Sequence, residues 1–399
     1  MQDHTRREWL WKTASALSGA CLTGCFPGRA SVAPAAPVAV GRSKTYDPTE
    51  VLPALGKMFD QLGGLGKLVK GKTVAIKINM TGQPGYRLGH LPPGETHYTH
   101  PHVIASAVHL IGKAGASRIR ILESPWNTAD PLEECLAQAN WEPNDFLSAA
   151  PHVEFENTNC LGLGQQYLRL AVPSGGLVYP AFDLNHSYHD CDVFVSIAKL
   201  KEHATAGVTL SMKNCFGITP CTIYGIGAGI DEPSKRPAGG RNSMHMGNRQ
   251  PSKSAPAEKD PGTPRQDTWR VPRIVTDLVS ARPVHLAIID GVKTMTGGEG
   301  PWVREDLKPA APGVLLAGLN PVSTDAVAMA VMGFDAMAGR GTPPFELCDN
   351  TLELAEGVGL GTRDLKRIEV VGTPVTEAKF DFAAIRRQRQ AAGRPFWSR

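Results

Sequence analysis

A group of polar side chains follows one apolar run in the middle of the chain. The run DVFVSI reads as a buried strand, and Lys199, Lys201, His203, Lys213 and Asn214 follow it. Such groups cost free energy inside a protein unless they are paired or used. Lys199 and His203 are four residues apart, so they share one face in either a strand or a helix. Lys201 joins that face only if the backbone is extended.

Other predicted strands end in groups of the same kind. These are Lys77 and Asn79 in KTVAIKINM, Glu123 and Ser124 in RIRILES, and Asp290 in HLAIIDG. Ligands of open parallel sheets bind beyond the carboxyl ends of the strands, so we expect these side chains to share one crevice. Glu299 in the loop GGEGP and Asp325 near a helix start are expected at the same edge. Each group alone could be a solvated loop residue or half of an ion pair, but their convergence favours a shared site.

The chemistry of this set suits a small anion. Lysines at 77, 199 and 213 offer positive charge for a carboxylate or phosphate, and a desolvated lysine can also act as a base. The predicted catalytic residues are Lys77, Glu123, Lys199, His203 and Asp290. The predicted ligand-binding residues are Asn79, Ser124, Lys201, Lys213, Asn214 and Glu299.

Histidines raise the alternative of a metal site. His100, His102 and His245, together with Asp325, are candidate ligands of a divalent cation. Helix capping and packing explain the same residues equally well. No pair of cysteines has CxxC spacing, so neither an iron-sulfur cluster nor a cysteine-rich zinc site is expected. The cofactor, if there is one, stays unknown at this point.

The elements that position these residues alternate along the chain. Asp47 and Pro48 predict a helix start, and an apolar face then runs to a stop at Gly63. KTVAIKINM, HVIASAVHLIGKAG and SRIRILES predict a βαβ unit, and further strands and helices follow, among them a helix over 207–216. We predict an α/β fold with a parallel or mixed sheet and helices on both faces.

Composition divides the chain into segments. Residues 47–380 form the predicted domain, with a Pro-, Gly- and Ser-rich insertion at about 220–268 that predicts a lid with a disordered part. Within that insertion, the piece around His245 is expected to dock on the domain. Residues 381–399 are predicted to be a basic tail.

The N-terminus carries the features of an export signal. Arg6 and Arg7 precede a short apolar stretch, so residues 1–24 resemble a twin-arginine signal peptide. Cys25 ends the sequence LTGC, which resembles a lipidation site, and residues 25–46 would then form an Ala- and Pro-rich tether. Simple cleavage within the Ala-rich stretch is the alternative. The protein is therefore expected outside the cytoplasm, either periplasmic or membrane-anchored.

The charge balance limits the class of partner. The formal net charge is +4 over 399 residues, and the basic residues are spread along the chain rather than clustered. This pattern argues against nucleic-acid binding. The expected partners are a small-molecule ligand, the twin-arginine export machinery and, through a lipid anchor, the membrane.

Several ordered motifs together resemble one family. VAIKINM, AKLKEH, VTLSMKNCFGITP, IIDGVKTMTGGEGP and GLNPVSTDAVAMAVMGFD are similar to the family named domain of unknown function 362 (DUF362). The resemblance implies a common α/β fold but no single reaction, and the iron-sulfur modules of some members have no counterpart here. We favour an enzyme that acts on a small anionic substrate, with metal assistance left open. A cofactor- or metal-bearing redox protein and a lipid-tethered binding protein without catalysis are the alternatives.

Overall fold

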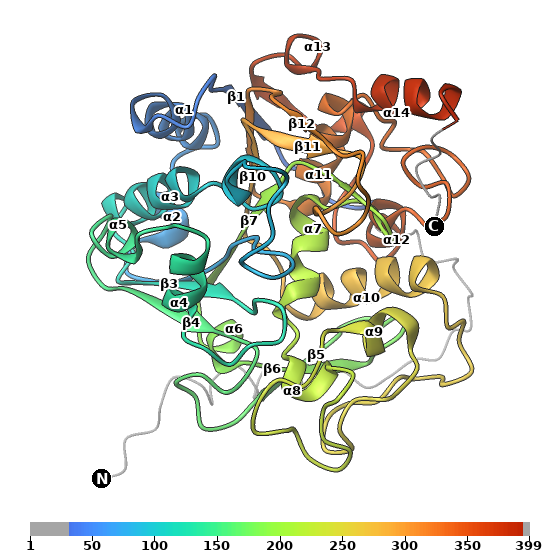
Figure 1. Ribbon diagram of the computed structural model, residues 1–399. Helices are drawn as coiled ribbons and strands as arrows, with labels where there is room; N and C mark the ends of the chain where they lie inside the picture. The colour runs from blue at the N-terminus through green and yellow to red at the C-terminus, as the bar shows by residue number, and fades with distance from the viewer. Residues whose placement is uncertain (1–31, 394–399) are drawn as a thin grey trace, which may run out of the picture. The chain divides into compact units, whose positions relative to one another are not determined.

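The computed structural model describes residues 32–393, and its centre is one mixed sheet of eight strands (Figure 1). The order across the sheet is β14-β1-β13-β10-β7-β2-β3-β4. The strands are β1 (Val38–Arg42), β2 (Thr73–Lys77), β3 (Arg118–Glu123), β4 (Val153–Asn157), β7 (Val193–Lys199), β10 (Leu286–Gly291), β13 (Val314–Gly318) and β14 (Val370–Gly372). From β4 to β10 all neighbours are parallel, whereas β13 runs antiparallel to both β10 and β1. The predicted α/β fold with a mixed sheet is confirmed.

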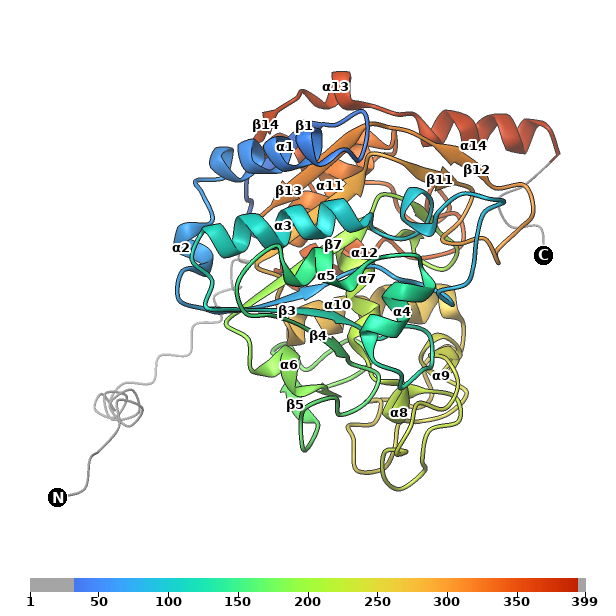
Figure 2. The same ribbon diagram turned by 60° about the vertical axis from the view of Figure 1, so that its left-hand side comes forward.

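Helices cover both faces of the sheet. One face packs on α1 (Pro48–Gln61), α3 (Pro101–Lys113), α4 (Leu132–Gln138) and α5 (Pro143–Leu147), with α1 beside α3 (Figure 2). The other face packs on α7 (Leu210–Asn214), α10 (Asp267–Ala281), α11 (Pro321–Val331) and α12 (Thr351–Gly357). Each buried strand therefore serves two separate apolar cores.

The strands divide their side chains between these cores by simple alternation. In β7, Val195 and Ile197 belong to the core with α1 and α3, and Phe194 belongs to the core with α7 and α10. Every residue of β7, β10 and β13 is buried. Successive side chains point to opposite faces of a strand, so a strand covered on both faces must be apolar at nearly every position.

Local signals in the sequence account for several helix ends. The Asp47 carboxylate caps α1 by accepting a hydrogen bond from the Thr49 N–H, and Pro48 occupies the first helical position. Gly63 follows the helix with φ of 91°, a conformation that costs glycine little. The His100 ring accepts a hydrogen bond from the His102 N–H at the start of α3, so it caps that helix.

The remaining elements are short. They are α2 (Gly66–Val69), η2 (Pro93–Glu95), the hairpin of β5 (Leu168–Ala171) and β6 (Ala181–Leu184), α6 (His186–His189), β8 (Glu202–His203) with β9 (Gly207–Val208), η3 (Cys215–Ile218), α8 (Cys221–Tyr224), α9 (Asn242–Met246), β11 (Thr294–Thr296) with β12 (Lys308–Ala310), η4 (Leu365–Arg367), α13 (Val375–Ala378) and α14 (Phe382–Ala391). The predicted helix over 207–216 is therefore wrong at its start, because β9 occupies Gly207–Val208 and α7 begins at Leu210.

Two segment boundaries also differ from the prediction. Residues 38–42, assigned to the tether, form β1 inside the sheet between β13 and β14. Its Val and Ala side chains fill both cores, which their Ala- and Pro-rich surroundings concealed. The predicted tail begins with α14, whose Arg386 side chain is buried and pairs with Glu202 and Glu346.

The insertion at 220–268 is packed against the domain rather than partly disordered. The Arg249 guanidinium donates hydrogen bonds to the carbonyl oxygens of Gly225, Ile226, Ala228 and Gly229, which ties two loops together. Glu258 lies 2.6 Å from the Arg270 guanidinium of α10, and both side chains are completely buried. Ion pairs and hydrogen bonds to main-chain oxygens thus supplement the few apolar side chains, Ile223, Tyr224, Met244 and Ala255, that this segment buries in the core.

The N-terminal predictions fall on a different part of the chain. Arg6, Arg7 and Cys25 lie outside the described residues, so the export signal and the lipid anchor stay predictions. Among residues 32–393, no helix has the length and apolar character needed to cross a membrane.

Candidate active site

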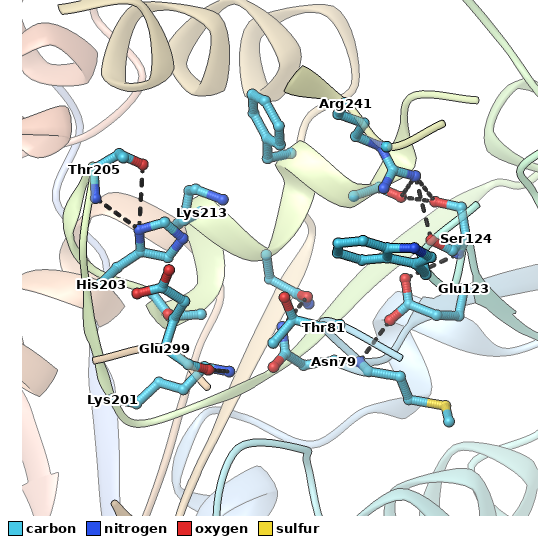
Figure 3. Close-up of a pocket in the computed structure, with 18 of the residues that line it drawn as sticks. Asn79, Thr81, Glu123, Ser124, Lys201, His203, Thr205, Lys213, Arg241 and Glu299 are labelled. Atoms are coloured by element: carbon cyan, nitrogen blue, oxygen red, sulfur yellow. Dashed lines mark hydrogen bonds between the residues drawn. The ribbon is translucent and has the colours of Figure 1, made fainter. Parts of the chain in front are cut away.

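A cavity of about 400 Å³ opens at the carboxyl ends of β2, β3 and β7. These three strands are parallel and adjacent, so their ends bring residues distant in sequence to one edge. Ten of the predicted residues line the cavity, namely Lys77, Asn79, Glu123, Ser124, Lys201, His203, Lys213, Asn214, His245 and Glu299. Figure 3 shows most of them surrounding one space.

Lys77 and Glu123 form a buried ion pair in the wall of this cavity. The Lys77 ammonium lies 2.5 Å from Oε1 of Glu123. The same carboxylate accepts hydrogen bonds from the backbone N–H groups of Met80, at 2.8 Å, and Ser124, at 2.9 Å. Burial lowers the pKa of Lys77, and the Glu123 charge opposes that shift. Because each charge has a partner, the pair can connect the ends of β2 and β3 in the cavity wall without leaving an uncompensated charge.

A second network joins two asparagines and leaves two oxygen atoms unpaired. Oδ1 of Asn214 accepts hydrogen bonds from Asn79, at 2.9 Å, and from the Lys77 ammonium, at 3.3 Å. Oδ1 of Asn79 and Oγ1 of Thr209 are buried and have no hydrogen-bond partner among the described residues. These two atoms can therefore accept hydrogen bonds from a molecule that binds in the cavity.

Lys201 and Glu299 connect the segment after β7 to the loop that carries Glu299. The Lys201 ammonium donates to the carbonyl oxygens of His97, at 2.6 Å, and Glu299, at 2.9 Å. The Glu299 carboxylate accepts a hydrogen bond from the Ala204 N–H at 2.9 Å. Burial lowers the pKa of Lys201 well below its ordinary value and raises the pKa of Glu299. The burial of both groups therefore favours their neutral forms.

The two histidines of the cavity have opposite tautomers, as judged from their hydrogen bonds. The Thr205 N–H donates to Nδ1 of His203 at 3.1 Å, so the neutral ring of His203 carries its proton on Nε2. Nδ1 of His245 lies 3.0 Å from the Arg241 carbonyl oxygen, which can only accept, so Nε2 of His245 is unprotonated. Burial lowers the pKa of His203 well below its ordinary value and that of His245 to about 4.

Lys213 is the least satisfied charge in the cavity. Its ammonium lies 4.4 Å from the centre of the Phe216 ring and has no hydrogen-bond acceptor among the residues that the structure describes. Burial lowers the pKa of Lys213 to about 7, and the Glu299 carboxylate opposes that shift. Both protonation states of this amine are therefore populated near neutral pH. Asp325 holds α7, the helix that carries Lys213, in place. Its two carboxylate oxygens accept hydrogen bonds from the Ser211 and Met212 N–H groups, both at 2.9 Å.

Arg241 is a functional candidate that the sequence analysis missed. Its Nε donates to the carbonyl oxygen of Thr219 at 2.8 Å, and Nη2 lies 3.2 Å from Oδ1 of Asn159 and also contacts Ser124 (Figure 3). All of these acceptors are neutral. Burial favours the neutral forms of Lys201 and Glu299, so the charged groups of the lining are the cations Lys77, Arg241 and protonated Lys213 and the carboxylate of Glu123. With neutral histidines, the cationic side chains outnumber the carboxylates by two, which favours an anionic ligand.

Lys199 and Asp290 lie outside this cavity, contrary to expectation. Lys199 occupies the same face of β7 as Val195 and Ile197, which packs on α1 and α3. Lys77 occupies the face of β2 that Ala75 shares, on the side of α7. A strand end therefore places a residue at the right edge, but the alternation of side chains decides which face it serves.

The four predicted metal ligands do not come together. His100 caps α3 and stacks on the Tyr46 ring at 3.7 Å, and Nδ1 of His102 lies 2.7 Å from the Tyr46 carbonyl oxygen. Asp325 caps α7, whereas His245 lines the cavity. Over residues 32–393, no three His, Cys, Asp or Glu side chains are grouped so that they could hold a metal ion.

Comparison with known proteins finds similarity over part of the chain. A thylakoid-associated protein of Synechocystis sp. is 28% identical over 184 residues, which are 46% of this chain and 50% of that protein. Among solved structures, the lactate racemase apoprotein from Thermoanaerobacterium thermosaccharolyticum has 14% identity and a TM-score of 0.33 over 65% of this chain and 50% of that chain. A protein from Thermotoga maritima has 12% identity and a TM-score of 0.35 over 68% of this chain and 55% of that chain. The chain thus spans about half the length of each of these proteins.

A family model covers a larger part of the chain than the curated relative does. It matches residues 74–330, which is more than half of the sequence and includes every residue that lines the cavity. The chain therefore belongs to the family described as domain of unknown function DUF362.

Proposed function

We propose that this protein is an enzyme that acts on a small anionic substrate, a carboxylate or a phosphate, in the cavity at the sheet edge. The observation that carries the proposal is Lys213, an amine with a pKa of about 7 that faces a cavity without a hydrogen-bond partner among the described residues. A proton-transfer group works best when its pKa is near the operating pH. A site that only binds anions is better served by a lysine that stays charged.

Substrate binding rests on the charge imbalance of the cavity. The Arg241 guanidinium has only neutral hydrogen-bond partners, so its charge is available to a carboxylate or phosphate. Once Lys213 has accepted a proton from the substrate, it adds a second positive charge beside the anion. The unpaired oxygens of Asn79 and Thr209 provide acceptors for a hydroxyl or amide group of the substrate.

Proton transfer is assigned to the side of the cavity that carries Lys213, His203 and Glu299 (Figure 3). Neutral Lys213 acts as the base, and Nε2–H of His203 donates a hydrogen bond to charge that develops on the substrate. Thr205 acts as a positioning residue, since its N–H fixes the tautomer of His203. A divalent metal as an assistant stays a prediction, which elemental analysis of the purified protein tests.

We place this reaction outside the cytoplasm. Arg6 and Arg7 support export by the twin-arginine route, and Cys25 supports lipid attachment after cleavage. The alternatives of a redox protein and a non-catalytic binding protein share the same cavity. The lowered pKa of Lys213 suits proton transfer, so it favours an enzyme over a redox protein and over a non-catalytic binding protein.

The test is a search for turnover in D₂O. Purified protein is incubated with a panel of small carboxylates and phosphate monoesters, and ¹H and ³¹P NMR follow deuterium uptake and product formation. We expect one class of compound to react with the wild type and not with Lys213→Met. The control is Lys253→Met, since Lys253 is exposed and pairs only with Asp231 at 2.8 Å. Stoichiometric binding of a panel member without any conversion would make the protein a binding protein instead.

A further inference from the structure

We infer that the cavity selects an anion with a planar aromatic ring. This inference rests on the proposed anionic substrate and concerns the same cavity. Two tryptophans, Trp126 and Trp302, line the cavity, and 39% and 38% of their surfaces are exposed. Tryptophan is largely buried in most proteins, so two exposed indoles at one cavity offer flat apolar surface to a partner.

Trp126 is held in a conformation that bulky residues rarely adopt. Its φ is 42°, in the left-handed region, and Ser124 and Pro125 separate it from the end of β3. Hydrogen bonds to the backbone oxygens keep it there: Nδ2 of Asn159 donates to Pro125 at 2.9 Å, and Sγ of Cys221 to Trp126 at 3.3 Å. Backbone strain of this kind persists where the surroundings enforce it and is concentrated at functional sites.

The ring of Trp302 packs closely against the backbone of two glycines. A Cβ atom on Gly82 would lie 2.4 Å from an atom of that ring, and one on Gly300 would lie 2.0 Å from it. A larger residue at either position would therefore displace this ring. The ring of Tyr86 lies 5.3 Å from the Trp302 ring and that of His97 lies 5.8 Å from it, the latter edge-on. Trp302 is thus packed in place before any ligand arrives, which lowers the entropy cost of binding.

The apolar and charged parts of the cavity favour one class of ligand when taken together. Inorganic phosphate would satisfy Lys213 and Arg241 but would leave the indole surfaces in water. An uncharged aromatic compound would cover the indoles but would leave the cations unpaired. An aromatic carboxylate or aryl phosphate meets both requirements, with its anionic group on the cations and its ring on a tryptophan.

The test compares pairs of probes that differ by the ring. Isothermal titration calorimetry measures phenyl phosphate against inorganic phosphate and benzoate against acetate, with the full chain. We expect each aromatic probe to bind about tenfold more tightly than its partner, as ring stacking and burial imply. In Trp126→Leu and Trp302→Leu, which keep apolar bulk, this preference should fall to about threefold or less while the ringless probes keep their affinity. Trp269→Leu, at a partly buried position on α10 outside the cavity lining, is the control and should keep the full preference.

Two results separate the possible failures. Equal affinity of each ring-bearing probe and its partner in the wild type would overturn the aromatic preference and leave the anion site intact. Failure of all four probes to bind would overturn this inference and the proposed anion site together. Circular-dichroism melting of each variant confirms that a lost preference is not lost folding.

Discussion

The ammonium of Lys199 lies 2.9 Å from Oδ2 of Asp290, and neither side chain reaches solvent. The Tyr46 hydroxyl joins the pair, since it accepts from Lys199 and donates to Oδ1 of Asp290, both at 2.8 Å. Lys199 also donates to the Gly94 carbonyl oxygen, and the His100 N–H donates to Asp290. A buried pair with this many hydrogen bonds ties β7 and β10 to the starts of α1 and α3.

Replacement of Lys199 by Met should therefore destabilise the protein strongly. The Asp290 carboxylate would stay buried without its counter-ion, which costs about 3–5 kcal/mol of unfolding free energy. Tyr46→Phe removes one hydroxyl and keeps the pair, so it should cost about 1–3 kcal/mol. Urea unfolding measures both, and benzoate affinity per folded molecule should not change. A Lys199→Met variant as stable as the wild type would show that the pair has no structural role.

The sequence predicted the strands and helices that carry long apolar patterns. The runs before Lys77 and before Lys199 are strands because apolar residues, several of them β-branched, fill both cores at nearly every position. β1 was missed because it is short and follows alternating Ala and Pro, a composition also typical of linkers. The fold of residues 220–268 was missed because the few apolar residues that it buries follow no periodic pattern, and hydrogen bonds and ion pairs hold the rest.

The candidate site was predicted where strand ends decide it. Lys77, Asn79 and Glu123 follow from parallel neighbouring strands. Lys199 and Asp290 were assigned to the wrong environment, because position at an edge does not say which face a side chain serves. Arg241 and the cavity tryptophans come from irregular segments, whose course depends on tertiary packing that no periodic pattern reports.

Lys213 should make stability depend on pH. Its pKa is about 7 in the folded protein, against an ordinary value of 10.5 when unfolded. Between these values the unfolded state binds more protons, so the Lys213 contribution rises with pH across this window; below pH 7 its full cost is present. Lys213→Met removes that cost, so the variant should be the more stable protein below pH 7, with the difference shrinking toward pH 10.5.

Urea unfolding of both proteins across this range measures the difference. His203, His245 and Glu299 titrate in the field of the Lys213 charge, so the difference reports Lys213 together with these three neighbours. Lys253→Met serves as the control and should follow the wild type at each pH, since that side chain is 74% exposed. A gain in Lys213→Met that does not vary with pH would contradict the lowered pKa.

Export should require the arginine pair. Replacement of Arg6 and Arg7 by Lys should leave the protein in the cytoplasm with its N-terminal segment uncleaved, as fractionation and mass spectrometry measure.

If Cys25 is acylated, the mature protein should enter the detergent phase and Cys25→Ala should not. Normal export of the Lys variant would refute the twin-arginine signal, and a mature N-terminus within the Ala-rich stretch would refute lipidation.

The C-terminal helix α14 should stabilise the segment that carries the cavity residues Lys201 and His203. Arg386 of α14 lies 3.0 Å from Glu202 and 2.6 Å from Glu346, and its side chain is 2% exposed. Glu202 stands between Lys201 and His203 in the chain, and its Oε2 accepts a hydrogen bond from the Gly297 N–H at 2.7 Å. Arg386 thus fixes the carboxylate that joins the His203 strand to the loop carrying Glu299.

Arg386→Met should weaken both folding and ligand binding. Glu202 would lose its buried counter-ion, which costs about 3–5 kcal/mol of unfolding free energy, and the cavity wall would loosen. Arg387→Met is a matched control on the same helix, because that side chain is 65% exposed and lies 3.9 Å from Asp381. The control should stay within about 0.5 kcal/mol of the wild type. Calorimetry with benzoate, corrected for the folded fraction, distinguishes the two roles of Arg386. A lower affinity per folded molecule identifies a positioning residue, whereas an unchanged affinity would limit Arg386 to holding the fold.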